Sequence, residues 1–215
     1  MTSGELGLRN DVYRRPLATA LERLGLGAGW CCADVGAGGG DVSVALAAMV
    51  GPSGRVYAVD SDPSARDAVA ARAAAHGAQV LSLTQAAEDL ILPEKVDLAF
   101  CRFLLPHVID PGAAIARMAG AVREGGWLVA QEPITSAGRI GGRPFSMPEA
   151  THPDVGAILP ALVAGTELTI VDTWSESPAG IGPGPVADYL EQITGVDPGR
   201  DPVVLPPLVT VIAQR

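Results

Sequence analysis

Two kinds of segment alternate along most of the chain. Short, nearly continuous apolar runs predict buried strands, and these cover residues 30–35, 54–60, 78–84, 96–102 and 127–133. Between them lie longer segments, two of which open on an acid followed by proline, at Asp62-Pro63 and Asp110-Pro111. That pair is a helix-start signal, because proline suits the first helical position. The alternation predicts an α/β fold, a parallel sheet with helices on both faces.

The two ends of the chain depart from this alternation. Residues 10–25 predict an N-terminal helix, with leucines at helical spacing and Gly25 as its stop. After Pro133 comes a stretch rich in glycine, proline and arginine, which predicts a loop over the site. Pro206 and Pro207 place the last strand at or near a sheet edge. The remaining predicted elements are a helix over 154–164, a strand over 167–174, a helix over 186–194 and a last strand over 203–215.

Composition narrows the possible functions. The chain has 215 residues, is 48% hydrophobic and carries a net charge of −9, which argues against an extended nucleic-acid surface. No apolar run approaches the length of a membrane span, so we expect a cytoplasmic protein without membrane association. The three cysteines suggest no disulfide framework, and the three histidines lack zinc-like spacing to them, so no metal is expected.

The sequence CCADVGAGGGDVSVAL, residues 31–46, carries the most specific signal. A dinucleotide fingerprint fails in both registers, because Asp41 and Ser43 stand where the third glycine is needed. The pattern that fits is Asp34-x-Gly36-x-Gly38-x-Gly40. An acid at the end of a strand suits a cationic ligand better than a pyrophosphate, and Asp60 can accept hydrogen bonds from ribose hydroxyls.

This motif resembles motif I of the class I S-adenosylmethionine-dependent methyltransferases. The stretch AAEDLILPEKVDLAFCRFLLPHVIDPGAAIARMAGAVREGGWLVAQEP, residues 86–133, resembles the following region of small-molecule methyltransferases of the ubiquinone/menaquinone-biosynthesis type. The likeness covers residues 30–133 and continues more faintly to the end. It implies one Rossmann-like, doubly wound, mostly parallel seven-stranded sheet over residues 30–215 with an antiparallel last strand, an N-terminal helical segment over 1–29, and a substrate-side loop over 133–153.

The resemblance implies S-adenosylmethionine as cofactor and S-adenosylhomocysteine as product. Asp34 is expected to reach the methionine ammonium, directly or through water, and Asp60 to bind the ribose. Ala86 departs from the family, which often has a polar adenine partner at this place; the Ala87 backbone N–H and Glu88 are the substitutes. The residues expected at the cofactor are Asp34, Gly36, Ala37, Gly38, Gly40, Asp60, Ser61, Ala87, Glu88, Cys101 and Arg102.

Methyl transfer needs mainly proximity and alignment, and a base only where the acceptor keeps its proton. His107 is the candidate base, or else it packs beside the helix that starts at Asp110. Arg102 forms either a salt bridge or a contact to a substrate or cofactor carboxylate. Loop residues expected near the substrate are Arg139, Arg143, Phe145 and Met147.

The class of methyl acceptor is inferred by elimination. The (D/N)-P-P-(Y/F) pattern of adenine methyltransferases is absent, since Arg102-Phe103-Leu104-Leu105-Pro106 follows the fourth strand. We therefore expect a small-molecule acceptor, no nucleic-acid partner, and a monomer or homodimer. Two alternatives remain open: a protein that binds the same cofactor without methylating, as a cyclase would, and an NAD-dependent oxidoreductase.

Overall fold

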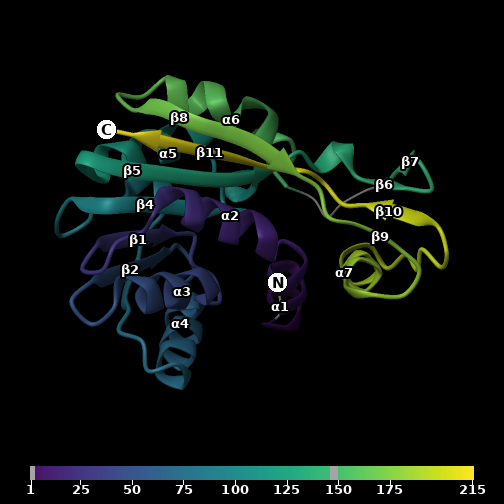
Figure 1. Cartoon of the computed structure of the whole chain (residues 1–215), viewed down its shortest axis with the longest axis horizontal. Helices are drawn as coiled ribbons and strands as arrows, with labels where there is room; N and C mark the ends of the chain where they lie inside the picture. Colours follow the sequence, from purple (N-terminus) through teal and green to yellow (C-terminus); the bar gives the residue numbers. More distant parts are fainter. Residues whose placement is uncertain (1–2, 146–149) are drawn as a thin grey trace.

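A seven-stranded sheet forms the centre of the computed structural model, which describes residues 3–145 and 150–215 (Figure 1). The strand order is β3-β2-β1-β4-β5-β11-β8. β11 runs antiparallel to both of its neighbours, and the other pairs are parallel. The predicted fold class is thus confirmed. The strands are β1 Cys31–Val35, β2 Arg55–Asp60, β3 Leu81–Thr84, β4 Val96–Arg102, β5 Val122–Pro133, β8 Thr169–Glu176 and β11 Leu208–Gln214.

Helices cover both faces of this sheet. α2 (Arg14–Leu24) and α3 (Asp41–Val50) pack on one face, with α4 (Pro63–Ala75) beside α3 against β2 and β3. α5 (Pro111–Ala121) and α6 (Val155–Ala164) pack on the other face. Alternate residues of each buried strand serve the two layers: in β4, Leu98 and Phe100 join the first, and Ala99 and Cys101 the second.

The last strand shows why its two prolines are tolerated. β11 lies one strand in from the sheet edge, between β5 and β8. Pro206 and Pro207 precede its first residue, Leu208, so neither interrupts its hydrogen bonds to the neighbouring strands. The predicted position near an edge is right, but the single strand predicted over 203–215 is wrong: residues 202–204 pair in a second sheet, and the two prolines separate them from β11.

The N-terminal segment forms two helices where a single one was predicted over residues 10–25. α1 (Ser3–Val12) and α2 meet at Tyr13, a buried residue whose hydroxyl donates to the carbonyl of Pro206 over 2.9 Å. Gly25 ends α2 in the left-handed conformation at φ 63°, as expected for a helix stop. The break at Tyr13 has a tertiary cause, because its ring is held among side chains from distant elements.

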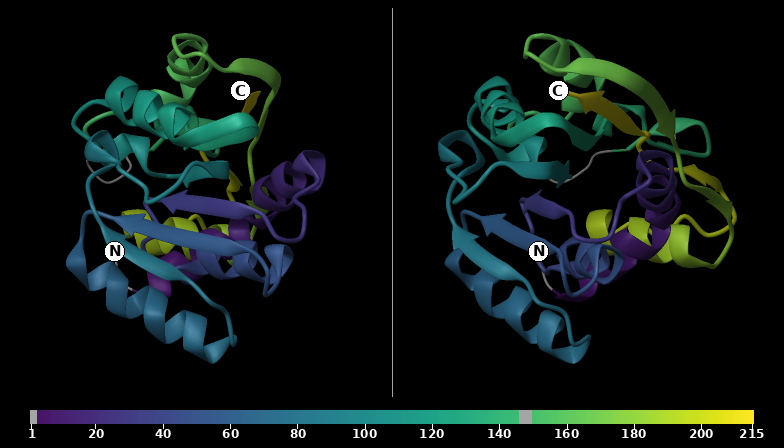
Figure 2. Two further views of the ribbon diagram at one scale, coloured as in Figure 1. Left: turned by 90° about the vertical axis from the view of Figure 1, so that its left-hand side faces the viewer. Right: turned by 60° about the vertical axis from the view of Figure 1, so that its left-hand side comes forward.

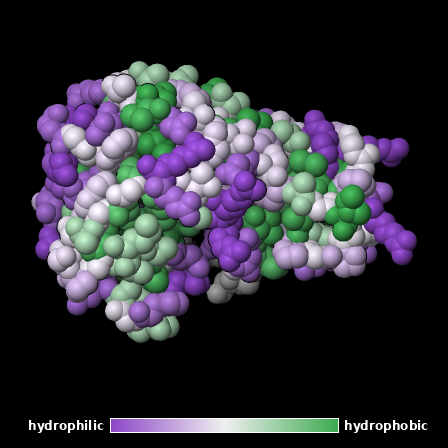
Figure 3. All heavy atoms as spheres, viewed as in Figure 1, coloured by the Kyte–Doolittle hydropathy of each residue, from purple (hydrophilic) through white to green (hydrophobic). Residues whose placement is uncertain are grey.

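A second, four-stranded sheet forms from the segment predicted to be a loop, from residues between the predicted strand 167–174 and helix 186–194, and from the start of the predicted last strand. Its order is β7-β6-β10-β9, all antiparallel. Figure 1 shows it extending from the main body, and in both views of Figure 2 its helix α7 (Pro185–Thr194) lies beside α1. Hydrophobic atoms reach the surface here (Figure 3), and Ile181 is 73% exposed. The strands are β6 Arg139–Ile140, β7 Arg143–Pro144, β9 Ala179–Ile181 and β10 Pro202–Val204, and the short 3₁₀ turns of the chain are η1 Ala87–Asp89, η2 Leu105–His107 and η3 Thr135–Ala137.

Candidate functional site

A pocket of about 420 Å³ opens at the carboxyl ends of β1, β2 and β4. This is where open parallel sheets bind their ligands. Sequence-predicted residues that line it are Gly36, Gly38, Asp60, Ser61, Ala87, Glu88, Arg102 and His107. Its other lining residues are Arg9, Val35, Gln85, Ala86, Phe103, Leu104, Val108 and Ile109.

The glycine-rich loop after β1 forms one wall of this pocket. Gly36 has φ +80°, and a Cβ there would lie 2.8 Å from Cδ1 of Leu104. Gly40 has φ +78°, and its Cβ would lie 3.1 Å from the backbone of Val69 in α4. Both positions therefore need glycine, for conformation and for space. Gly38 differs, because it lines the pocket and a Cβ there would meet no protein atom within 4 Å. A side chain at Gly38 would instead occupy ligand space.

Asp60 ties this loop to β2. Its Oδ2 accepts a hydrogen bond from the Gly38 amide over 2.8 Å, and its Oδ1 accepts one from the Asp62 amide over 2.9 Å. The carboxylate is thereby fixed at the mouth of the pocket. Each of its oxygens retains a lone pair for a ligand hydroxyl.

Asp34 lies deeper than the motif suggests. It is 2% exposed, does not line the pocket, and its Oδ2 accepts from the Ser43 hydroxyl over 2.5 Å. Burial raises the pKa of Asp34 to about 6, although the bonds from Ser43 oppose the shift. Its contact with a ligand ammonium stays a prediction. Ala37, Gly40 and Cys101 likewise lie outside the pocket lining.

The turn η1 forms the opposite wall, where adenine was expected. Glu88 Oε1 accepts from the Ile109 amide over 2.8 Å and from the Asp110 amide over 3.4 Å, so it joins η1 to the start of α5. The neighbouring Gln85 side chain is bonded to both backbone groups of Ile91. Glu88 thus lines the pocket with part of its acceptor capacity already used, and its contact with adenine stays a prediction.

Phe103 follows β4 with φ 53°, the one positive φ of a non-glycine residue in the described part of the chain. Such a conformation is sterically costly and persists where the surroundings hold it. The Cζ atoms of Arg9 and Arg102 lie 4.6 and 5.3 Å from the ring centroid, and the Tyr13 ring meets it edge-on at 5.1 Å. Sequence reasoning missed Phe103 and Arg9. The position of Phe103 directly after Arg102 was a signal in the sequence that could have identified it. No sequence signal pointed to Arg9.

Arg102 is 6% exposed and lines the pocket. Its Nη2 donates to the Tyr13 carbonyl over 2.7 Å, while its buried Nε has no hydrogen-bond partner. Burial, and then the positive charge of Arg9, lower the pKa of Arg102 to about 10. Because Arg102 contacts a backbone carbonyl and no carboxylate within 4.0 Å, the salt-bridge interpretation does not hold for the described residues.

Behind the pocket, Glu132 at the end of β5 is fully buried. Its Oε1 accepts from the amides of Leu104 and Leu105, each over 3.2 Å, and lies 3.6 Å from Sγ of Cys101. Burial raises the pKa of Glu132 to about 8. Burial and then Glu132 also raise the pKa of the Cys101 thiol, which is therefore not a nucleophile. Glu132 holds the segment that carries Leu104 over Gly36.

His107 and the predicted loop residues lie in different parts of the fold. His107 sits on the pocket rim, where partial desolvation and then Arg9 lower its pKa, so it is neutral at pH 7. Arg139, Arg143 and Phe145 belong to the small sheet or follow it directly, and none lines the pocket; Met147 is outside the described residues. The Arg139 guanidinium donates to the carbonyls of Ser136 and Gly138.

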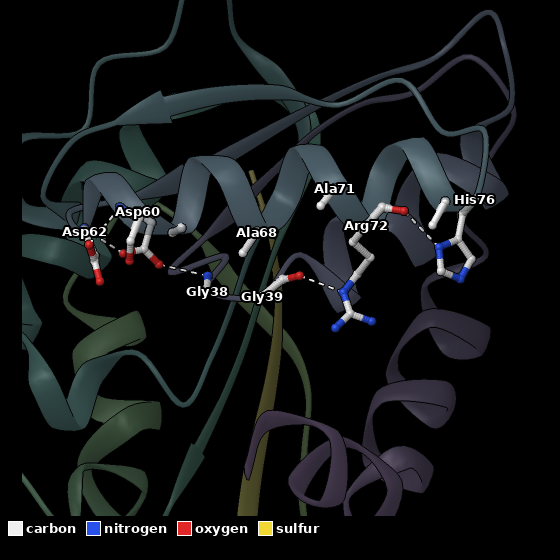
Figure 4. Close-up of a pocket in the computed structure, with 11 residues that line it drawn as sticks. Gly38, Gly39, Asp60, Asp62, Ala68, Ala71, Arg72 and His76 are labelled. Atoms are coloured by element: carbon white, nitrogen blue, oxygen red, sulfur yellow. Dashed lines mark hydrogen bonds between the residues drawn. The ribbon is translucent and has the colours of Figure 1, made fainter. Parts of the chain in front are cut away.

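A second hollow, of about 550 Å³, lies on the other side of the glycine loop, along α4 (Figure 4). Four alanines of α4 line it, and it shares Gly38 and Asp60 with the first pocket. Figure 4 shows Arg72 reaching from α4 to the loop, where its Nε donates to the Gly39 carbonyl over 2.7 Å. Arg72 also forms an ion pair with Asp41 at 2.7 Å, so it links α4 to the glycine loop and to the start of α3.

Two properties of the described residues bear on what kind of site they can form. No group of three or more histidine, cysteine, aspartate or glutamate side chains among them could hold a metal ion. None of their helices has both the length and the apolar character needed to cross a membrane.

Comparison with known proteins bears on the class of protein to which the chain is similar. Residues 32–126 match the family model described as a methyltransferase domain. No curated protein matches the sequence. Among solved structures, the chain is similar to a SAM-dependent methyltransferase from Aquifex aeolicus, with 18% identity, a TM-score of 0.61, and coverage of 91% of this chain and 87% of that one.

Two further structures share the fold. The N-methyltransferase NodS from Bradyrhizobium japonicum, in complex with S-adenosylhomocysteine, is 16% identical, with a TM-score of 0.60 and coverage of 94% and 87%. The [4+2]-cyclase SpnF is 17% identical, with a TM-score of 0.65 and coverage of 94% and 80%. Residues 32–126 are therefore similar to a methyltransferase domain, and the solved structures share the fold of the whole described chain. The predicted enzyme class, an S-adenosylmethionine-dependent methyltransferase, and its predicted cofactor agree with this partial domain match and with the shared fold.

Proposed function

We propose that this protein transfers the methyl group of S-adenosylmethionine to a small-molecule acceptor, at oxygen, nitrogen or carbon, by in-line displacement. The observation that carries the proposal is the pocket at the ends of β1, β2 and β4, whose glycine loop is bonded to Asp60. Its volume suits one nucleoside-sized ligand. The open space at Gly38 leaves room for a ligand against the backbone.

The residues divide the work as follows. Asp60 accepts the ribose hydroxyls, Ala87 and Glu88 face the adenine, and Asp34 acts on the ammonium from beneath the loop. When bound, the cofactor supplies a methyl group already activated by its sulfonium. The pocket contributes proximity and alignment, which can lower the activation free energy by about 7 kcal/mol or more. His107, neutral at pH 7, removes the proton of an acceptor hydroxyl.

A small acceptor is supported by elimination, because the net charge of −9 and the absent (D/N)-P-P-(Y/F) pattern both disfavour a nucleic-acid substrate. We extend the proposal to an acceptor class like that of the ubiquinone/menaquinone-type enzymes, a cytoplasmic location, and a monomer or homodimer. The substrate-side loop over 133–153 remains part of the proposal. Its residues Arg139, Arg143 and Phe145 lie in or next to the small sheet, so they would contact the acceptor from that side.

Calorimetric titration tests the cofactor site. We expect S-adenosylmethionine and S-adenosylhomocysteine to bind with about micromolar affinity, and Asp60→Asn to weaken both about tenfold or more, because charge-assisted bonds are lost. Asp67→Asn, an exposed acid on α4, is the matched control and should leave binding unchanged. Binding of NAD in place of both sulfur compounds would refute the proposal and favour the oxidoreductase.

The similarity to the cyclase SpnF favours one second candidate, a protein that binds the cofactor without methylating. Mass spectrometry for S-adenosylhomocysteine after incubation with a panel of phenols, amines and carbon acids separates the two. Cofactor that binds yet stays unconverted with every acceptor would support the second candidate.

A further inference from the structure

An exposed isoleucine lies at the mouth of the pocket. Ile109 lines the pocket and is 89% exposed. A single exposed apolar side chain is ordinary on a protein surface and by itself indicates nothing. What distinguishes Ile109 is its place, because it lies two residues after the proposed base, His107, and both residues line the same pocket.

The backbone between these two residues directs their side chains to the same side. Val108 has φ −80° and ψ 163°, which is extended backbone. Side chains alternate between two faces along extended backbone, so the residues before and after Val108 point the same way. The burial agrees with this, because Val108 is 8% exposed whereas His107 and Ile109 are both exposed. An acceptor whose hydroxyl faces His107 would therefore lie along Ile109.

Hydrogen bonds hold Ile109 in this position. Its amide donates to Oε1 of Glu88 over 2.8 Å, and its carbonyl accepts from Nε2 of His152 over 3.2 Å. The His152 amide also donates to the Pro106 carbonyl over 3.1 Å, so the chain before α6 is bonded twice to the 106–109 turn. A side chain on a fixed backbone loses less conformational freedom when a ligand covers it, and this favours binding.

The segment after β4 gives the pocket an apolar wall, and the lining as a whole has no net charge. Phe103, Leu104 and Val108 line the pocket together with Ile109. His107 is neutral at pH 7, because desolvation and then Arg9 lower its pKa. Neither sign of charge is in excess to select an ionic acceptor. The charged lining residues are two arginines and two acids: Arg9, Arg102, Asp60 and Glu88.

We propose that Ile109 determines acceptor specificity by packing against an apolar ring of an uncharged acceptor whose hydroxyl faces His107. This inference rests on the proposed function and narrows its acceptor to a neutral hydroxy compound with apolar surface beside the hydroxyl. Covering the Ile109 side chain removes apolar surface from water, and the affinity gained rises with the area covered. A larger apolar acceptor is therefore preferred to a smaller one with the same hydroxyl.

The test uses 2-naphthol and phenol, two neutral hydroxy compounds that differ by one apolar ring. Each is titrated by calorimetry into protein saturated with S-adenosylhomocysteine, which has no methyl group to transfer. The variants are Ile109→Thr, which keeps the β-branch but loses apolar surface, and Ile109→Leu, which keeps the apolar surface. Ile91→Thr is the matched control, because Ile91 is 74% exposed and lies outside the pocket lining, and both of its backbone groups are bonded to the Gln85 side chain.

We expect wild type, Ile109→Leu and the control to bind 2-naphthol at least about tenfold more tightly than phenol. Ile109→Thr should lose about threefold or more of this preference and keep its affinity for S-adenosylhomocysteine.

An unchanged preference in Ile109→Thr, or no binding of 2-naphthol to wild type, overturns the proposal. If Ile109→Thr weakens S-adenosylhomocysteine and leaves the preference unchanged, Ile109 belongs to the cofactor site, and the proposal is overturned as well. Failure of wild type to bind S-adenosylhomocysteine would instead refute the proposed function. A comparison of 2-naphthol binding to unliganded wild type and unliganded Ile109→Thr then decides the apolar contact separately.

Discussion

Glu132→Gln probes the buried carboxyl behind the pocket through the pH dependence of stability. Glutamine keeps the shape of the side chain, and its Oε1 can still accept from the amides of Leu104 and Leu105. It cannot ionise. The pKa of Glu132 is raised by burial from 4.5 to about 8 in the folded protein. The native state therefore holds this proton more tightly than the unfolded chain does, and the variant removes that difference.

The sign and size follow from linkage. Because the folded pKa lies above the unfolded one, the stabilisation is fully present below pH 4.5 and is lost as the pH rises through 8. With these two pKa values, the wild type loses about 4 kcal/mol of unfolding free energy between pH 5 and pH 9 from this group alone. Glu132→Gln should match the wild type at pH 5 within about 1 kcal/mol and become clearly more stable at pH 9.

Urea unfolding at pH 5, 7 and 9 measures the effect. Glu124→Gln is the control, since Glu124 lies on the same strand with its side chain 91% exposed. Other titrating groups, Asp34 among them, are common to both proteins and cancel in the difference. A wild type and a variant whose unfolding free energies run parallel from pH 5 to pH 9 would show that Glu132 is not held protonated by burial, and the reasoning would be refuted.

Two further predictions concern the pocket itself. Gly36→Ala should abolish cofactor binding measured by calorimetry, because its Cβ meets Leu104 and φ +80° adds a strain of about 1–3 kcal/mol. The control Gly77→Ala, at φ +62° with open space around it, should bind the cofactor normally. Equal affinities of the two variants would contradict the close approach at Gly36. His107→Gln should lower kcat about 100-fold or more without weakening cofactor binding. The wild-type rate should fall as the pH drops through the lowered pKa of His107. An unchanged rate and pH profile in the variant would show that His107 is not the base.

Much of the fold and of the cofactor wall could be predicted because it is local in sequence. The strand runs, the Asp-Pro helix starts and the glycine motif each lie within a short segment, and short crossovers bring Gly38 and Asp60 to the same sheet end. The near-edge position of the last strand was also predictable from its two prolines, whereas its antiparallel direction was implied only by the family resemblance. What decides these features is hydrophobic period and turn chemistry, which a single sequence displays.

The remainder depends on long-range contact. The small sheet pairs strands of two and three residues from opposite ends of the C-terminal region, too short to show a period. Arg9 reaches the pocket only because α1 and α2 bend at Tyr13, and that bend is set by neighbours such as Phe103 and Tyr189. The strained φ of Phe103 likewise has no sequence signature, since phenylalanine seldom adopts it.

The hydrogen bond from Tyr13 to Pro206 also constrains the order in which the protein assembles during synthesis. Its partners are separated by 193 positions, and β11, which begins two residues later, enters the sheet between two strands made earlier. Tyr13 also holds Arg102 through its carbonyl. While the ribosome is still translating the region before Pro206, the β5 and β8 edges lack their partner and Tyr13 lacks its anchor. The arginine end of the pocket, at Arg102, therefore forms late, and a nascent chain should lack a finished binding site until β11 emerges from the ribosome.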